Sequence, residues 1–209
     1  MAKTSASLAE SLARRVKAVD GTRRSVEATV LAGSVSVRSA EQLYEGLFLA
    51  VFTSFETFLE DLFVGLLVQG SGLVSSRSDV VPRMAIRSHQ IARDVVIGPG
   101  SRRYAAWMPF EATERRAKML FRGGRPFALL EIADRHALNQ AYVIRNAIAH
   151  KSRESLRQFN AKVIGSLPLP AREQTPGGFL RSTFRAAPVQ RRYEVVVAGL
   201  VGAARKLSK

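Results

Sequence analysis

Apolar residues recur at intervals of three to four along most of this chain, which is the period of amphipathic helices rather than of strands. The segments with this period are 6–32, 39–69, 109–121, 126–150, 152–160 and 188–207. No stretch alternates convincingly with a period of two. We therefore predict an all-α fold, a bundle of five or six helices, and, at 209 residues, one domain spanning 1–209.

The second helical segment has the clearest pattern. Ser39 and Gln42 have the spacing of a capping box, in which each side chain bonds a free backbone amide at a helix start. Gly70 and Gly72 follow as a stop signal. Its apolar stripe, which we expect in the core, is Leu43, Leu47, Val51, Phe55, Phe58, Leu62 and Leu66.

Charge is uneven along this part of the chain. Between Arg38 and Arg77 there are five acidic residues and no basic one. We expect these acids to find basic partners inside the fold or across a dimer.

Residues 71–108 have no helical period. Met84 to His89 alternates weakly, Asp94 to Gly98 has strand character, and Gly98 to Ser101 has the composition of a turn. We expect a partly irregular insertion with room for a small hairpin. Pro109 then suits the first turn of the next helix, and Ser152 is placed to cap the short helix 152–160.

The charge of the chain indicates the class of its binding partner. The net charge is +15 and the sequence pI about 11.2. Residues 105–209 hold 19 basic and 7 acidic residues, a net of 19 − 7 = +12. Such a field attracts polyanions, although arginine-rich codon usage raises basic content without any function. We expect a nucleic-acid partner.

The chain has no cysteine, which excludes disulfides, thiolate metal sites and cysteine nucleophiles. This fits a reducing cytosol, and Met1 to Ser11 lacks the apolar core of a signal peptide. The longest apolar run, 47–68, is broken by polar residues and predicts a buried helix, not a membrane span. We expect a cytoplasmic protein that needs no metal or cofactor.

The most informative stretch lies at the end of the segment 126–150. Residues 144–152 read Ile-Arg-Asn-Ala-Ile-Ala-His-Lys-Ser. Metal-free RNA cleavage needs a base for the ribose 2′-hydroxyl, a cation for the charged phosphate, and an acid for the leaving oxygen. Histidine, with an ordinary pKa near ~6.5, suits the first and third roles. Arginine suits the second.

Helical geometry relates these residues. At about 100° per residue, Asn146 and His150 lie within about 40° of each other, whereas Arg145 and His150 lie about 140° apart. Asn146 can therefore orient His150 within one chain. Arg145 reaches the same substrate if the helix frays or if a second copy faces the first. A single His150 also cannot be both base and acid in one turnover.

The motif Arg145, Asn146, His150 resembles the Arg–polar–three residues–His signature of HEPN domains. Phe55 to Phe63 resembles the preceding helix of the RiboL-PSP-type HEPN group. The resemblance covers about 40–69 and 126–160 and is not visible across 71–108. It implies a HEPN-like bundle, a homodimer with a composite active site, and a metal-independent endoribonuclease that leaves a 2′,3′-cyclic phosphate and a 5′-hydroxyl.

In this interpretation His150 transfers protons, Arg145 stabilises the transition state and Asn146 orients His150. Further residues are assigned supporting roles: Lys151, Arg153 and Arg157 as RNA phosphate contacts, and Glu56 and Glu60 as acids that orient Arg145.

Simpler roles stand beside these. Arg145 can pair with an acid of the second helix, His150 can cap a helix end favoured by the macrodipole, and the remaining polar residues can be solvated. His136 suits a surface position, and His89 has no assigned role.

The resemblance also implies a toxin–antitoxin or phage-defence context with a neutralising antitoxin or neighbouring regulatory protein. The first alternative is a non-catalytic HEPN-like module that binds RNA or a nucleotide. A weaker one is a basic helical DNA-binding protein, for which the sequence shows no helix-turn-helix.

Overall fold

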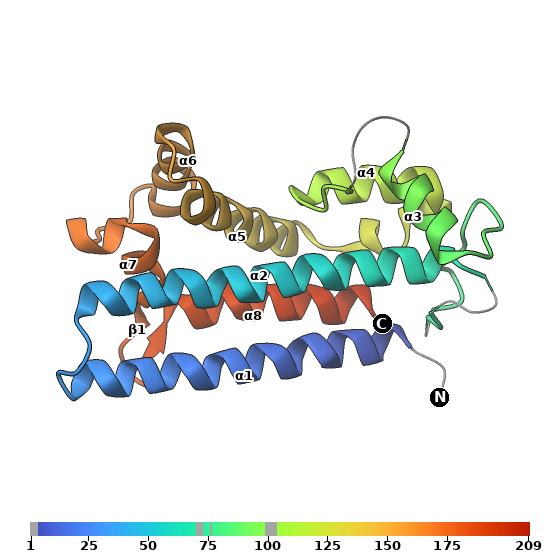
Figure 1. Ribbon diagram of the computed structural model, residues 1–209. Helices are drawn as coiled ribbons and strands as arrows, with labels where there is room; N and C mark the ends of the chain where they lie inside the picture. The colour runs from blue at the N-terminus through green and yellow to red at the C-terminus, as the bar shows by residue number, and fades with distance from the viewer. Residues whose placement is uncertain (1–3, 70–72, 76, 99–103) are drawn as a thin grey trace. The chain divides into compact units, whose positions relative to one another are not determined.

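The computed structural model describes residues 4–69, 73–75, 77–98 and 104–209 (Figure 1). This part of the chain contains eight α-helices and one two-stranded sheet, which confirms the all-α class. The helices are α1 (Ser5–Leu31), α2 (Val37–Leu67), α3 (His89–Ile97), α4 (Phe110–Leu120), α5 (Ile132–His150), α6 (Arg153–Phe159), α7 (Pro176–Arg181) and α8 (Arg192–Leu207). The antiparallel strands are β1 (Thr183–Arg185) and β2 (Gln190–Arg191). The sequence did not predict α3, α7 or the strands.

The fold divides into two compact units. Unit 1 comprises Met1–Ala13, Phe55–Leu138 and Val201–Lys209, and unit 2 comprises Arg14–Ser54 and Asn139–Leu200. The prediction of a single domain stays a prediction. No helix among the described residues combines the length and apolar character needed to cross a bilayer.

Aromatic packing forms the core of unit 1. The ring centroid of Phe63 lies 4.8 Å from that of Phe127, 5.1 Å from Phe121 and 5.3 Å from Trp107. All four side chains are buried. Aromatic side chains bury large apolar areas, and edge or tilted contacts of this kind add to that gain. This cluster therefore joins α2 to the segments that flank α4.

The expected strand at 94–98 is wrong, because these residues continue α3. Ser88 adopts an extended conformation and its hydroxyl accepts from Ile91 N, which starts the helix. Ala92 and Val96, four residues apart, then bury on one helical face. Isolated bridges, including Val68 with Ile86, replace the hairpin. The turn expected at 98–101 and the stop at Gly70 and Gly72 lie mostly or wholly outside the described residues.

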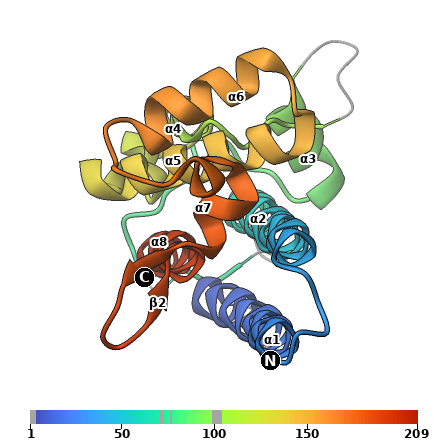
Figure 2. The same ribbon diagram turned by 90° about the vertical axis from the view of Figure 1, so that its left-hand side faces the viewer.

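In unit 2 the parts of α1, α2 and α8 run side by side (Figure 1; Figure 2). The α1 helix continues through Gly21, and Gly33 follows its end with a φ of 72°. The rings of Tyr44 on α2 and Tyr193 on α8 meet edge to face at 5.6 Å. The apolar face of α8 matches the prediction, with Tyr193, Val196, Val197, Leu200, Ala204 and Leu207 buried.

The start of α2 differs from the predicted capping box. Ser39 N donates to Ser36 Oγ at 3.1 Å, so Ser36 caps the helix three residues earlier than expected. The buried face also differs at this end, since Tyr44 is 0% exposed and Leu43 is 45% exposed. From Val51 to Leu66 the predicted stripe is confirmed.

The predicted start of the motif helix at Pro126 is also wrong. Phe127–Leu129 is a turn of 3-10 helix, and Leu130 returns to an extended conformation. The α5 helix begins at Ile132, where Asp134 Oδ2 accepts from the Glu131 amide at 3.2 Å. Its end at His150 is as predicted.

The Pro/Gly-rich segment after α6 contains α7. Thr175 caps it, accepting from Gly178 N at 3.1 Å, and Pro176 occupies its first turn. A Cβ on Gly177 would lie 2.6 Å from the carbonyl oxygen of Glu41, and one on Gly178 would collide with the carbonyl oxygen of Arg172. Gly177 thus lets α7 approach the backbone of α2 closely, and Gly178 lets α7 pack against the segment just before it.

Candidate functional site

The chain turns sharply between α5 and α6 in unit 2 (Figure 1). Lys151 adopts a left-handed φ of 48° and its amide bonds Ala147 O at 3.2 Å, which ends α5 at His150. Ser152 then caps α6 as predicted, since Ser155 N donates to its hydroxyl at 3.1 Å. We call Arg145, Asn146, His150, Lys151, Arg153, Glu154 and Arg157 the α5–α6 corner.

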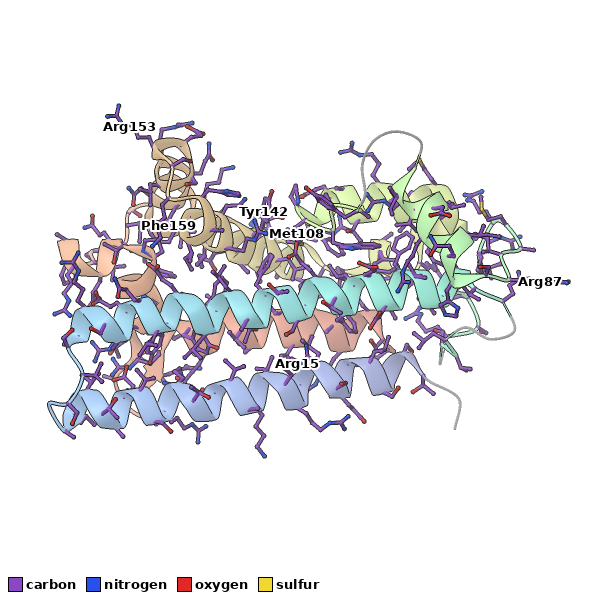
Figure 3. All side chains as sticks on the ribbon, in the orientation of Figure 1. Arg15, Arg87, Met108, Tyr142, Arg153 and Phe159 are labelled. Carbon is purple, nitrogen blue, oxygen red and sulfur yellow. The ribbon has the colours of Figure 1, made fainter. Side chains whose placement is uncertain are left out.

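The corner presents one buried and one open side. Ile144, Ala147 and Ile148 are buried and hold the end of α5 in the unit. His150 and Arg153 are exposed. The Arg153 side chain points away from the helices (Figure 3). His150 therefore lies at the surface of the unit, where solvent reaches it.

Arg145 and Asn146 act as a pair. Arg145 Nη1 donates to Asn146 Oδ1 at 3.1 Å, and both residues are half-buried. The bond uses the oxygen of Asn146, so its amide nitrogen and the remaining guanidinium hydrogens are donors for an anion. The expected bond from Asn146 to His150 is not formed, and within the described ranges no hydrogen bond holds the imidazole.

Two of the three predicted phosphate contacts are engaged with acids. Lys151 Nζ lies 3.3 Å from Glu45 Oε2, and Arg157 donates twice to Glu154, at 2.8 Å each. Hydrogen bonds from Arg157 and Gln158 lower the pKa of Glu154 to about 2. Lys151 and Arg157 are exposed, and water screens their charges, so each can exchange its carboxylate for a phosphate.

Arg153 differs from these two cations. In the part of the chain that the structure describes, no acid pairs with it.

Three acids of α2, Glu41, Glu45 and Glu60, pair with basic residues inside the fold, as expected. Glu41 lies 2.9 Å from Arg172 and Glu45 pairs with Lys151, both within unit 2. Glu60, in unit 1, lies 3.5 Å from Arg93. Glu56 and Glu60 belong to unit 1 and Arg145 to unit 2, so their orienting role stays a prediction.

A buried polar network in unit 2 was not predicted. Arg23 is 6% exposed and donates to Asp20 at 2.7 Å, to Glu194 at 2.8 Å and to the Tyr44 hydroxyl at 3.3 Å. The sequence held a signal for it. Arg23 lies four residues after Val19 and three before Val26, in line with these apolar residues of α1, where a core side chain is expected.

Glu27 is the second centre of this network. It accepts from Arg181 at 2.9 and 3.2 Å, from Arg191 at 3.3 Å and from the Tyr44 hydroxyl at 2.9 Å. Burial acts to raise the pKa of Glu27, but the bonds from Arg181 and Tyr44 and the nearby arginine charges outweigh it and hold the pKa below its usual range. Burial and the bond to Glu27 raise the pKa of Tyr44 to about 12. We call Asp20, Arg23, Glu27, Tyr44, Arg181, Arg191 and Glu194 the Glu27 network.

The other two histidines, His89 and His136, are exposed. Among the described residues, no group of three or more histidine, aspartate or glutamate side chains is placed to hold a metal ion.

Comparison with known protein families, curated proteins and solved structures finds no match to this chain.

Proposed function

We propose that this protein is a homodimeric endoribonuclease that cleaves RNA without a metal ion. The observation that carries the proposal is the α5–α6 corner. It places an exposed histidine at a helix end, one turn after an arginine–asparagine donor pair and beside the open cation Arg153. These are the groups that transesterification at an RNA phosphate needs.

In this reaction His150 takes the proton from the ribose 2′-hydroxyl, and the resulting oxygen attacks the adjacent phosphorus. Arg145 and the amide nitrogen of Asn146 stabilise the charge that builds on the phosphate oxygens. The bond to the 5′-oxygen breaks, and a protonated histidine supplies its proton. The products are a 2′,3′-cyclic phosphate and a 5′-hydroxyl.

The second histidine is His150 of a second copy. One imidazole cannot start the step unprotonated and end it as the proton donor, because both roles are needed together. The angle of about 140° between Arg145 and His150 on a regular helix also favours a partner's Arg145 facing each His150. The proposal thus requires a dimer, and it extends to a cytoplasmic toxin or defence protein with a neutralising partner.

The test is cleavage of single-stranded RNA in excess EDTA. We expect the wild-type chain to produce cyclic-phosphate ends, and His150→Ala to lower the rate by about 10²–10⁴-fold, the usual contribution of a general acid or base. His136→Ala is the matched control, because His136 is an exposed histidine of the same helix. An active His150→Ala variant would remove the proposal.

A non-catalytic RNA-binding module is the second candidate. The observation in its favour is that no hydrogen bond from a described residue holds the His150 imidazole, which leaves it without an orienting group. Tight RNA binding without any cleavage, with intact RNA ends after long incubation in EDTA and in Mg²⁺, would establish this alternative.

A further inference from the structure

The hairpin formed by β1, β2 and their turn, residues 183–191, exposes two large apolar side chains. Phe184 is 54% exposed and Val189 is 67% exposed. Between them lie Arg185, the last residue of β1, and the turn residues Ala186, Ala187 and Pro188. Single exposed apolar residues are ordinary on protein surfaces, so the surroundings of Phe184 decide whether it has a role.

The base of the hairpin is fixed by ion pairs. Arg181 precedes β1 and Arg191 ends β2, and both donate to Glu27. The Arg191 amide also donates to Glu194 at 2.7 Å. The hairpin is therefore held in place before any ligand arrives, which lowers the entropic cost of binding through it.

A cation lies against the ring of Phe184. The guanidinium carbon of Arg192 is 5.8 Å from the centroid of Phe184 and 5.3 Å from that of the buried Phe179. The Arg192 Nε is buried and has no hydrogen-bond partner within the described residues. Arg192 is thus held by two aromatic rings, and it places positive charge beside a ring that is half open to solvent.

The hairpin segment itself carries only positive charge. Between Glu173 and Glu194 the chain has four arginines and no acid. Glu27 engages Arg181 and Arg191. Arg185, next to Phe184, is exposed, and in the described part of the chain no acid pairs with it. An exposed aromatic ring, a neighbouring open arginine and a cation beneath the ring complement a base and its phosphate.

We propose that the hairpin binds single-stranded RNA, with Phe184 stacking on an unpaired base and Arg185 binding an adjacent phosphate. Arg192 positions the ring of Phe184. The strand must be single because base faces are open to stacking only when unpaired. This inference rests on the proposed function only in taking RNA as the ligand. It does not require catalysis.

Fluorescence anisotropy with a labelled single-stranded RNA whose 2′-hydroxyls are methylated measures binding without cleavage. Stacking on one aromatic side chain corresponds to a loss of between about 5- and 150-fold on truncation. We expect Phe184→Ala to weaken binding within this range, and Phe184→Tyr to stay within about twofold of wild type because it keeps the ring. Arg185→Ala should reduce the slope of log affinity against log salt by about 1, the change expected when one phosphate contact is lost.

Controls separate stacking from simple apolar contact. Leu31→Ala removes a more exposed apolar side chain of unit 2, 87% exposed, and should not change affinity. Phe184→Leu keeps apolar bulk without a ring and should bind as weakly as Phe184→Ala. Unchanged affinity in Phe184→Ala, or wild-type affinity in Phe184→Leu, overturns the inference. So does Phe184-dependent binding to anionic phosphatidylserine vesicles without an effect on RNA.

The outcomes distinguish the two proposals. If RNA is cleaved and Phe184→Ala binds like wild type, the hairpin proposal alone fails. If RNA is bound through Phe184 but never cleaved, the endoribonuclease proposal alone fails. If the wild-type chain binds no RNA, both fail. Circular dichroism of each variant verifies that the fold is retained.

Discussion

The Glu27 network and the α5–α6 corner contain the same types of charged side chain in opposite environments. Both lie in unit 2 and both pair arginines with carboxylates. The side chain of Arg23 is 7% exposed, whereas that of Arg157 is 68% exposed. In the network Arg23 is shielded from water, its partners are part-buried, and the charges depend on one another. At the corner the charges stay solvated, so little free energy is needed to break an ion pair.

This difference in exposure distinguishes charges that stabilise the fold from charges that are open to a ligand, in a chain with 32 basic residues. Removing one member of a buried pair leaves an uncompensated charge, which costs about 3–5 kcal/mol. Removing one member of an exposed pair costs about 0–1 kcal/mol. Network variants should therefore change stability, and corner variants should change the proposed RNA cleavage with little effect on stability.

The largest expected effect is that of Arg23→Met. It leaves Asp20 and Glu194 short of a buried partner and should lower the free energy of unfolding by about 3–5 kcal/mol. Arg24→Met is the matched control, because Arg24 pairs with the same Asp20 but its side chain is 74% exposed, and it should cost less than about 1 kcal/mol. Urea denaturation measures both. Equal losses would mean that burial does not distinguish the two arginines.

Acid should weaken the network through Glu27. Its pKa is lowered in the folded state, so its contribution is fully present above its unfolded pKa and is lost as pH falls through the folded value. Glu27→Gln should thus be less stable than wild type at neutral pH, and the gap should narrow on acidification below about pH 4.5. Urea midpoints at several pH values measure this. A gap constant with pH would contradict the role of the charge.

The turn at Lys151 should show a smaller effect. A left-handed φ costs a residue with a Cβ about 1–2 kcal/mol, and glycine avoids that cost. Lys151→Gly should be more stable than Lys151→Ala by this amount, since both lose the pair with Glu45. At Arg153, the first residue of α6, the order should reverse, with alanine more stable by about 0.5–1 kcal/mol. Thermal unfolding of the four variants tests the sign at each position.

The smallest effect is expected from Glu154→Gln. It frees Arg157 to bind a phosphate. The slope of log RNA affinity against log salt should therefore steepen by about 1, the change expected for one added contact. Glu10→Gln adds the same charge at an exposed position in unit 1 and should not steepen it. If both variants respond equally, net charge rather than the corner sets RNA affinity.

The sequence predicted the elements whose local signals agree with their packing. The apolar face of α8, the cap at Ser152 and the end of α5 at His150 all follow from periodicity or capping chemistry within a few residues. The class of the fold follows from the same signals.

The failures have a common physical cause, which is interaction with residues distant in sequence. Tyr44 displaces Leu43 from the core because its hydroxyl reaches Glu27 and Arg23. Arg23 is buried because acids from α1 and α8 surround it. At 94–98 the cap at Ser88 and the burial of Val96 outweigh the β-propensity of two valines. The role of the corner in RNA cleavage stays a prediction.

The close approach of α7 to α2 has a consequence for how the protein can vary. In a saturation library, positions 177 and 178 should accept only glycine, because any side chain would strike a carbonyl oxygen. Ala186 and Ala187, a few residues later at the exposed hairpin turn, should accept many substitutions. The contrast offers a signature by which distant relatives of this chain can be sought: two adjacent glycines that are kept unchanged, followed closely by a turn whose sequence varies.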